Sequence, residues 1–126
     1  MIVNLLHVAL GGAIGAALRY AVGIGIVRLT GHTAFPVAIL TVNILGSFLM
    51  GVFVVAAAHR GLTHLSPLVM TGLLGGFTTF SAFSLEAVTL YERGDMAGAV
   101  FYVTASVVLS ILGLVAGLWL ARGMFA

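Results

Sequence analysis

The charged residues of this 126-residue chain are so widely spaced that the gaps between them are long enough to cross a lipid bilayer. No Asp, Glu, Lys or Arg occurs in residues 29–59, 61–85 or 96–121. A transmembrane helix needs about 20 predominantly apolar residues, so each gap can hold one span. The first 27 residues can hold another span, which only Arg19 interrupts.

We therefore predict an all-helical integral membrane protein that forms one four-helix transmembrane domain over residues 1–126. Only 6% of the residues are charged, whereas a soluble domain carries about 25%. Such a chain cannot cover a water-exposed surface with charge and needs a lipid bilayer around it. The helices are expected at residues 3–27, 36–58, 67–91 and 97–121.

The arginines do not select one orientation in the membrane. With four spans, the second connection and the C-terminus share one side, which carries Arg60 and Arg122. The opposite side carries Arg28 and Arg93, so the excess of Lys and Arg that normally marks the cytoplasmic side is missing. Either the histidines or the N-terminal amine decide the orientation, or the chain inserts both ways and pairs with itself as an antiparallel homodimer.

Small residues recur at the spacing that lets membrane helices approach closely. Gly11–Gly15, Gly72–Gly76 and Gly113–Gly117 each form a G-x-x-x-G pair. Such pairs bring backbones together where no hydrophobic force drives helices to associate. We expect tight helix contacts at these three places.

The stretch GGFTTFSAF, residues 75–83, places glycines, hydroxyls and aromatic rings together inside the third span. Paired glycines weaken a helix, so we predict a break of the third helix there. Irregular backbone at membrane depth has to be buried in protein or line a cavity, and its free carbonyls can bind cations. Phe80 and Phe83 share a helical face. They either pack, or turn their positive ring edges toward an anion.

Other polar residues inside the spans have two interpretations each. Asn43 either bonds to a neighbouring helix or offers its N–H donors to an anion. Ser106 and Ser110 share one face and either bond to their own helix carbonyls or form a hydroxyl track. Arg19 either extends to the interface or acts as a buried positive charge that attracts an anion or holds a carboxylate. Glu86 is expected near the interface or paired with an arginine.

Four motifs together resemble the Fluc (CrcB) family of fluoride channels. They are GGAIGAALRY in the first span, TVNILGSFLMG in the second, GLLGGFTTFSAFSLE in the third and the ERG connection before the fourth. The resemblance implies a dual-topology antiparallel homodimer with two fluoride pores in a bacterial or archaeal inner membrane. Ala82 stands where the family often has threonine, a change that we expect to be tolerated.

The resemblance also assigns roles to individual residues. The pore lining that it implies consists of Asn43, Thr79, Phe80, Phe83, Ser106 and Ser110. Arg19 is implied to lie toward the aqueous entrance. A structural sodium ion at the centre of the dimer is implied to bind the backbone carbonyls of Gly75 and Thr78.

Two other functions compete with a fluoride channel. A small proton-coupled multidrug transporter can also be a four-helix, dual-topology dimer, but it uses an acid in the first helix, where this chain has Arg19. A membrane assembly subunit would explain the glycines but leave the polar residues without a role. We expect no enzymatic activity, since the chain has no cysteine and no paired carboxylates. Scattered arginines without lysine also predict no nucleic-acid binding.

Overall fold

The computed structural model describes residues 1–125, which form four helical segments long and apolar enough to cross a membrane. They are α1 (Ile2–Thr30), α2 (Val37–Arg60), a third segment (Thr63–Glu92) and α5 (Met96–Phe125). The four expected spans are confirmed, and their ends differ from the expected positions by at most four residues.

The third segment consists of several shorter pieces. These are η1 (Thr63–Leu65), the π-helix η2 (Pro67–Leu74), α3 (Gly75–Phe77) and α4 (Phe80–Glu92). The predicted break is confirmed, but its expected position at the glycine pair is wrong. Gly75 is helical, with φ −64°, whereas Thr78 and Thr79 adopt extended conformations between α3 and α4. Gly76 serves instead for close approach to α1, as described below.

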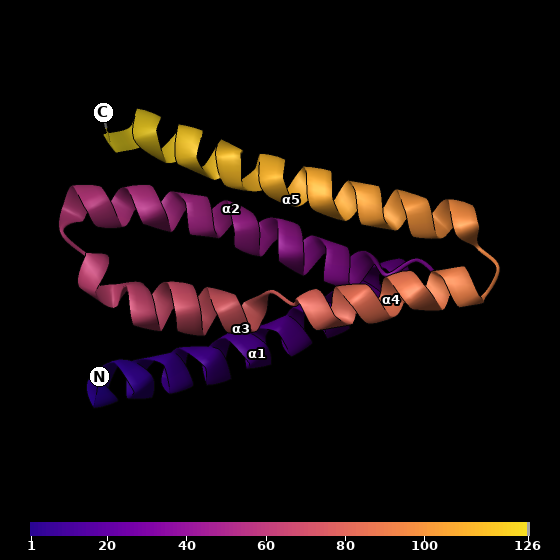
Figure 1. Ribbon diagram of the computed structural model, residues 1–126, viewed down its shortest axis with the longest axis horizontal. Coiled ribbons are helices and arrows are strands. Elements are labelled where there is room, and N and C mark those ends of the chain that lie inside the picture. The colour runs from indigo at the N-terminus through magenta and orange to yellow at the C-terminus, as the bar shows by residue number, and fades with distance from the viewer. Residues whose placement is uncertain (126) are drawn as a thin grey trace.

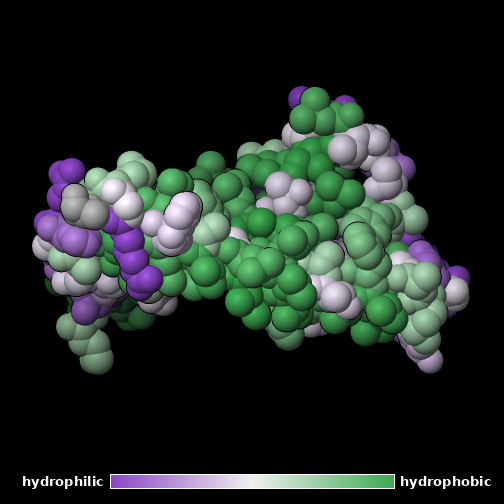
Figure 2. Space-filling model, turned by 90° about the horizontal axis from the view of Figure 1, so that it is seen from above, coloured by the Kyte–Doolittle hydropathy of each residue, from purple (hydrophilic) through white to green (hydrophobic). Residues whose placement is uncertain are grey.

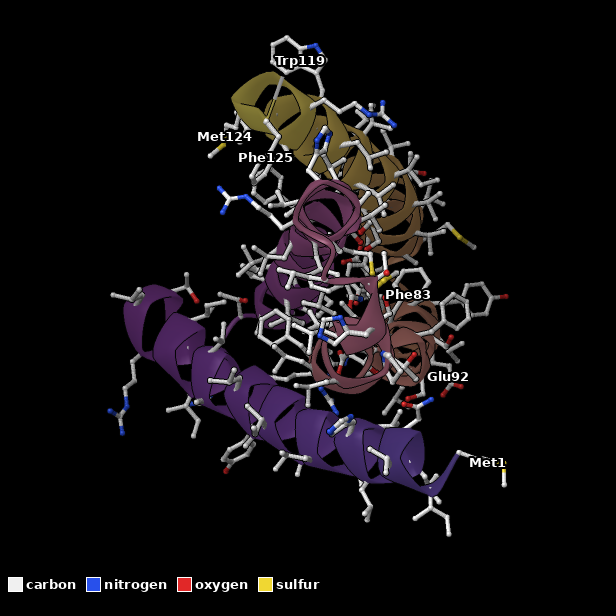
Figure 3. All side chains as sticks on the ribbon, turned by 90° about the vertical axis from the view of Figure 1, so that its left-hand side faces the viewer. Met1, Phe83, Glu92, Trp119, Met124 and Phe125 are labelled. Carbon is white, nitrogen blue, oxygen red and sulfur yellow. The ribbon has the colours of Figure 1, made fainter. Side chains whose placement is uncertain are left out.

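The helices lie side by side rather than as a closed bundle. α1 and the third segment run together in one direction, and α2 and α5 run together in the other (Figure 1). Both termini lie at the same end of the molecule as the connection between α2 and η1. Viewed end-on, α1 and α5 lie on opposite sides of the middle helices (Figure 3).

Glycines hold the two pairs of neighbouring helices in contact, as expected. A Cβ atom at Gly15 of α1 would overlap the carbonyl of Leu73 in η2. In the other pair, a Cβ at Gly51 would overlap the carbonyl of Leu114, and one at Gly117 would overlap the carbonyl of Phe48. Backbone lies directly against backbone in both pairs, which is how small residues stabilise helix association in lipid.

Most of the molecular surface is apolar. Apolar side chains fill the middle of the face shown in Figure 2, and hydrophilic residues gather at its two ends. In each span, only 11–17% of the most apolar stretch is buried inside the chain. A single copy therefore encloses little interior, and its outward-facing residues need lipid or another protein surface.

The glycine contacts predict that Gly15→Ala separates α1 from η2. The new methyl group meets backbone atoms, which cannot move aside as a flexible side chain can, so we expect a loss of about 1–3 kcal/mol of stability. Gly25→Ala on the same helix is the matched control, because nothing lies within 4 Å of the added Cβ. Thermal unfolding in detergent compares the two variants, and equal stability would contradict the packing argument.

Candidate functional site

Asn43 of α2 bonds to the broken part of the third segment through both ends of its amide. Its Nδ2 donates to the Thr79 carbonyl at 3.0 Å, and its Oδ1 accepts from the Thr79 backbone N–H at 2.8 Å. The Asn43 side chain thus exchanges two hydrogen bonds with the backbone of Thr79, as a residue of a neighbouring β-strand would. Of the two interpretations of Asn43, the bond to a neighbouring helix is present, and one of its two N–H donors remains for another partner.

Thr79 also begins the next helix. Its Oγ1 accepts from the Ala82 backbone N–H at 3.1 Å, which makes Thr79 the N-cap of α4. In an uninterrupted helix, the N–H of Thr79 would donate to the carbonyl of Gly75, and that of Ala82 to the carbonyl of Thr78. Both donors are used elsewhere, so the carbonyls of Gly75 and Thr78 lose their regular partners at the break.

The Gly76 carbonyl, which lies between the carbonyls of Gly75 and Thr78 in sequence, accepts a hydrogen bond from a side chain of α1. Arg19 Nε donates to the Gly76 carbonyl at 3.2 Å. Arg19 also lines a cavity of about 620 Å³ between α1, α2 and α4, together with Arg28 and His32. The same side chain thus contacts the break, and the aqueous entrance implied for Arg19 stays a prediction.

A pocket of about 420 Å³ opens beside the break, between α2, α4 and α5. It brings together all six residues that the sequence suggested as a pore lining, from three separate parts of the chain. They are Asn43, Thr79, Phe80, Phe83, Ser106 and Ser110. Gly46, Ser47 and Thr78 add further polar or small groups to its wall. Arg19 and Gly75 lie outside this lining.

The two phenylalanines of the pocket have different environments. Their ring centroids are 5.4 Å apart with the planes inclined at 52°. Phe83 is 9% exposed and also contacts the ring of Tyr102, at 5.3 Å between centroids. Phe80 is 78% exposed although it lines the same pocket. Phe80 therefore faces outward, where it needs lipid or another protein surface around it.

The serine face of α5 carries one residue that the sequence argument missed. Tyr102 lies one turn before Ser106, so Tyr102, Ser106 and Ser110 follow each other at four-residue spacing. The hydroxyls of Tyr102 and Ser106 are buried and have no hydrogen-bond partner within residues 1–125. Ser106 thus does not bond to its own helix, which favours the hydroxyl-track interpretation. The spacing from Ser106 was the signal that could have identified Tyr102.

Glu86 lies apart from this pocket. It lines a smaller cavity of about 230 Å³ with His32, Arg93 and the connection between α1 and α2. The connection between α1 and α2, which lines this cavity, lies toward the end of the molecule opposite to the two termini (Figure 1). Both positions expected for Glu86, near the interface or with an arginine, stay predictions.

Comparison with known proteins identifies close relatives over the whole chain. The profile of the family described as CrcB-like protein, Camphor Resistance (CrcB), matches residues 6–118. The fluoride-specific ion channel FluC of Roseobacter denitrificans is 68% identical over 123 residues, or 97% of this chain and 98% of the relative. FluC of Jannaschia sp. is 79% identical over 103 residues, or 79% of this chain and 98% of the relative. FluC of Cereibacter sphaeroides is 59% identical over the full length of both chains.

The paired bonds of Asn43 predict that Asn43→Leu destabilises the break. Leucine has similar volume but leaves the N–H and C=O of Thr79 without partners, at a cost of about 1–3 kcal/mol for each group. Amide hydrogen exchange should accelerate in Phe77–Ala82, and thermal stability in detergent should fall. Ser47→Ala is the control, because it removes another polar group from the pocket and leaves the Asn43–Thr79 bonds in place. Equal exchange in the two variants would contradict this assignment.

Proposed function

The chain belongs to the CrcB-like family, and we infer that it is a fluoride-specific ion channel and a multi-pass membrane protein. The FluC names of its relatives support this function. The structural observation that carries it is the single pocket in which an amide, several hydroxyls and two aromatic rings converge beside a helix break. No charged side chain lines that pocket.

This lining suits a small, strongly hydrated anion. An ion that leaves water has to regain hydrogen-bond donors, yet a conducting site has to release the ion again. Asn43 has one N–H left, and the hydroxyl of Ser106 has no protein partner within residues 1–125. The edges of Phe80 and Phe83 add positive poles without net charge. We propose that fluoride passes these groups, with Thr79 and Ser110 completing the path.

We propose that two copies form an antiparallel homodimer. The large exposure of Phe80 supports it, since the pocket is incomplete on the side where this ring lies open. The equal numbers of arginine at the two ends of the spans also support it, because neither end is favoured for the cytoplasm. Two such pockets in a dimer correspond to two pores.

We propose that the carbonyls of Gly75 and Thr78 hold a sodium ion at the centre of the dimer. The loss of their regular helix donors to Asn43 and to Thr79 Oγ1 supports this assignment. Carbonyl oxygens are hard ligands suited to such a cation. When bound, the ion would supply positive charge and a link between the two copies.

The function is tested by fluoride efflux from liposomes that contain the purified protein, followed with a fluoride electrode. We expect rapid efflux of fluoride and little efflux of chloride under the same gradient. A preparation that elutes as a folded species and moves neither ion would contradict the function.

The two rings are tested in the same assay with Phe80→Ile and Phe83→Ile. Isoleucine keeps bulk and hydrophobicity but removes the aromatic edge, so we expect normal elution with fluoride efflux reduced at least about tenfold. If the rings only pack, the volume-conserving change costs less than about 1.5 kcal/mol and efflux persists. Wild-type efflux in both single variants and in the double variant would show that packing is their only role.

The antiparallel dimer is tested by biasing the orientation of the chain. Thr63→Lys with His64→Lys should direct one end of the spans to the cytoplasm, and Tyr91→Lys with Glu92→Lys should direct the other end there. We expect each double variant alone to lose efflux and the two co-expressed to regain it. A C-terminal reporter that shows one orientation for the wild type would argue against dual topology.

The sodium ion is tested by exchanging sodium for N-methyl-D-glucamine on both sides of the liposome membrane. We expect slower fluoride efflux and a smaller dimer fraction in detergent. Efflux and dimer content that stay unchanged after thorough removal of sodium would contradict the proposed site.

A further inference from the structure

We propose that Arg19 is a positioning residue, which fixes the broken backbone of the third segment through a hydrogen bond rather than through its charge. The consequence for conduction rests on the channel function proposed above. The bond from Arg19 Nε to the Gly76 carbonyl joins residues 57 positions apart in the chain. It also connects α1 to the break, although α1 contributes no residue to the pocket of Phe80 and Phe83.

The Gly76 carbonyl needs this donor because of the break. In a continuous helix it would accept from the backbone N–H of Phe80, but the extended residues Thr78 and Thr79 move Phe80 into a new helix. Arg19 supplies a donor to this carbonyl from another helix.

The packing of α1 holds Arg19 in place for this bond. A Cβ at Gly76 would lie 2.7 Å from the Gly12 carbonyl and 3.2 Å from the Ala16 N–H nitrogen. A Cβ at Gly15 would lie 2.9 Å from the Phe77 nitrogen. Gly12, Gly15, Ala16 and Arg19 follow the 3–4 residue spacing of one helix face. Arg19 thus continues the face that packs against the end of α3.

The bonded carbonyl lies between the two proposed as sodium ligands. Gly75 and Gly76 are consecutive, and Thr78 follows two residues later. A peptide plane fixed at Gly76 limits the direction of the adjacent Gly75 carbonyl, since only two dihedral angles per residue can rotate, and it limits that of Thr78 less directly, across Phe77. We infer that losing the Arg19 bond lowers the affinity for sodium without removing any sodium ligand.

The identity of the donor atom makes this inference testable. The bond comes from Nε and not from the outer guanidinium nitrogens. Glutamine places its Nε2 the same number of bonds from Cα, so Arg19→Gln keeps a donor at this position and removes the charge. Arg19→Met ends the same number of bonds from Cα as Arg19→Gln and removes donor and charge together. Arg28→Met is the control, since it removes a charge from the same cavity.

The first measurement is amide hydrogen exchange of Phe77–Ala82 in detergent. Losing one hydrogen bond from a charged group should speed exchange about ten- to hundredfold in Arg19→Met. We expect Arg19→Gln and Arg28→Met to stay within about threefold of the wild type. Fast exchange in Arg19→Gln, or wild-type exchange in Arg19→Met, would overturn the proposal. If Arg19→Met does not fold, the exchange rate in Arg19→Gln alone tests the proposal.

The second measurement is the sodium concentration for half-maximal fluoride efflux. A general loss of stability would lower the efflux at every sodium concentration and would not shift this midpoint. We expect it to rise severalfold in Arg19→Met and to stay near the wild-type value in Arg19→Gln. If Arg19 acts only by attracting anions, both variants lose efflux equally and keep the wild-type sodium dependence, which overturns the proposal. A wild type without fluoride efflux would contradict the channel function, while the exchange experiment would still test the role of Arg19.

Discussion

The two hydrogen bonds between Asn43 and the backbone of Thr79 are the interaction on which the rest of the site depends. A helix cannot break inside a bilayer unless its free polar groups find partners within the protein. Asn43 supplies a donor and an acceptor at once, which allows Thr78 and Thr79 to leave the helix. The break then places Phe80 and Phe83 in the wall of the pocket and leaves two nearby carbonyls without their regular helix donors. The geometry of one amide thus determines both the aromatic wall and the candidate cation site.

The close helix contacts explain why this arrangement is possible in a chain of only 126 residues. Asn43 can reach Thr79 only if α2 approaches the break closely, and Gly46 allows this because a Cβ there would overlap the methyl group of Thr78. The same reasoning applies on the other side of the break, where Gly12 and Gly76 meet. Small residues therefore do more than join helices. They bring polar side chains within hydrogen-bond distance of a backbone that lipid could not satisfy.

The sequence was sufficient for the spans and for the existence of the break, but not for the residues at which the break occurs. The spans follow from the absence of charge over long stretches, which is a property of the sequence alone. The position of the break depends on which polar groups find partners, and this is decided between helices. The glycine pair predicts the weak point, yet Gly75 and Gly76 are helical and Gly76 packs against α1, while Thr78 and Thr79 are extended. Tyr102 was missed for a related reason, since only the structure shows that its hydroxyl is buried without a partner.

The site also separates charge from the path proposed for the anion. The pocket of Phe80 and Phe83 has no charged side chain in its lining, while Arg19 bonds to backbone on the other side of the break. A guanidinium inside a narrow path would bind a small anion tightly and slow its release. Placed behind the break, the same group can stabilise the carbonyl end of α3 and still contribute positive potential at a distance, because lipid and protein screen charge weakly. The position of Arg19 therefore reconciles a half-buried cation in α1 with a pocket built from neutral donors.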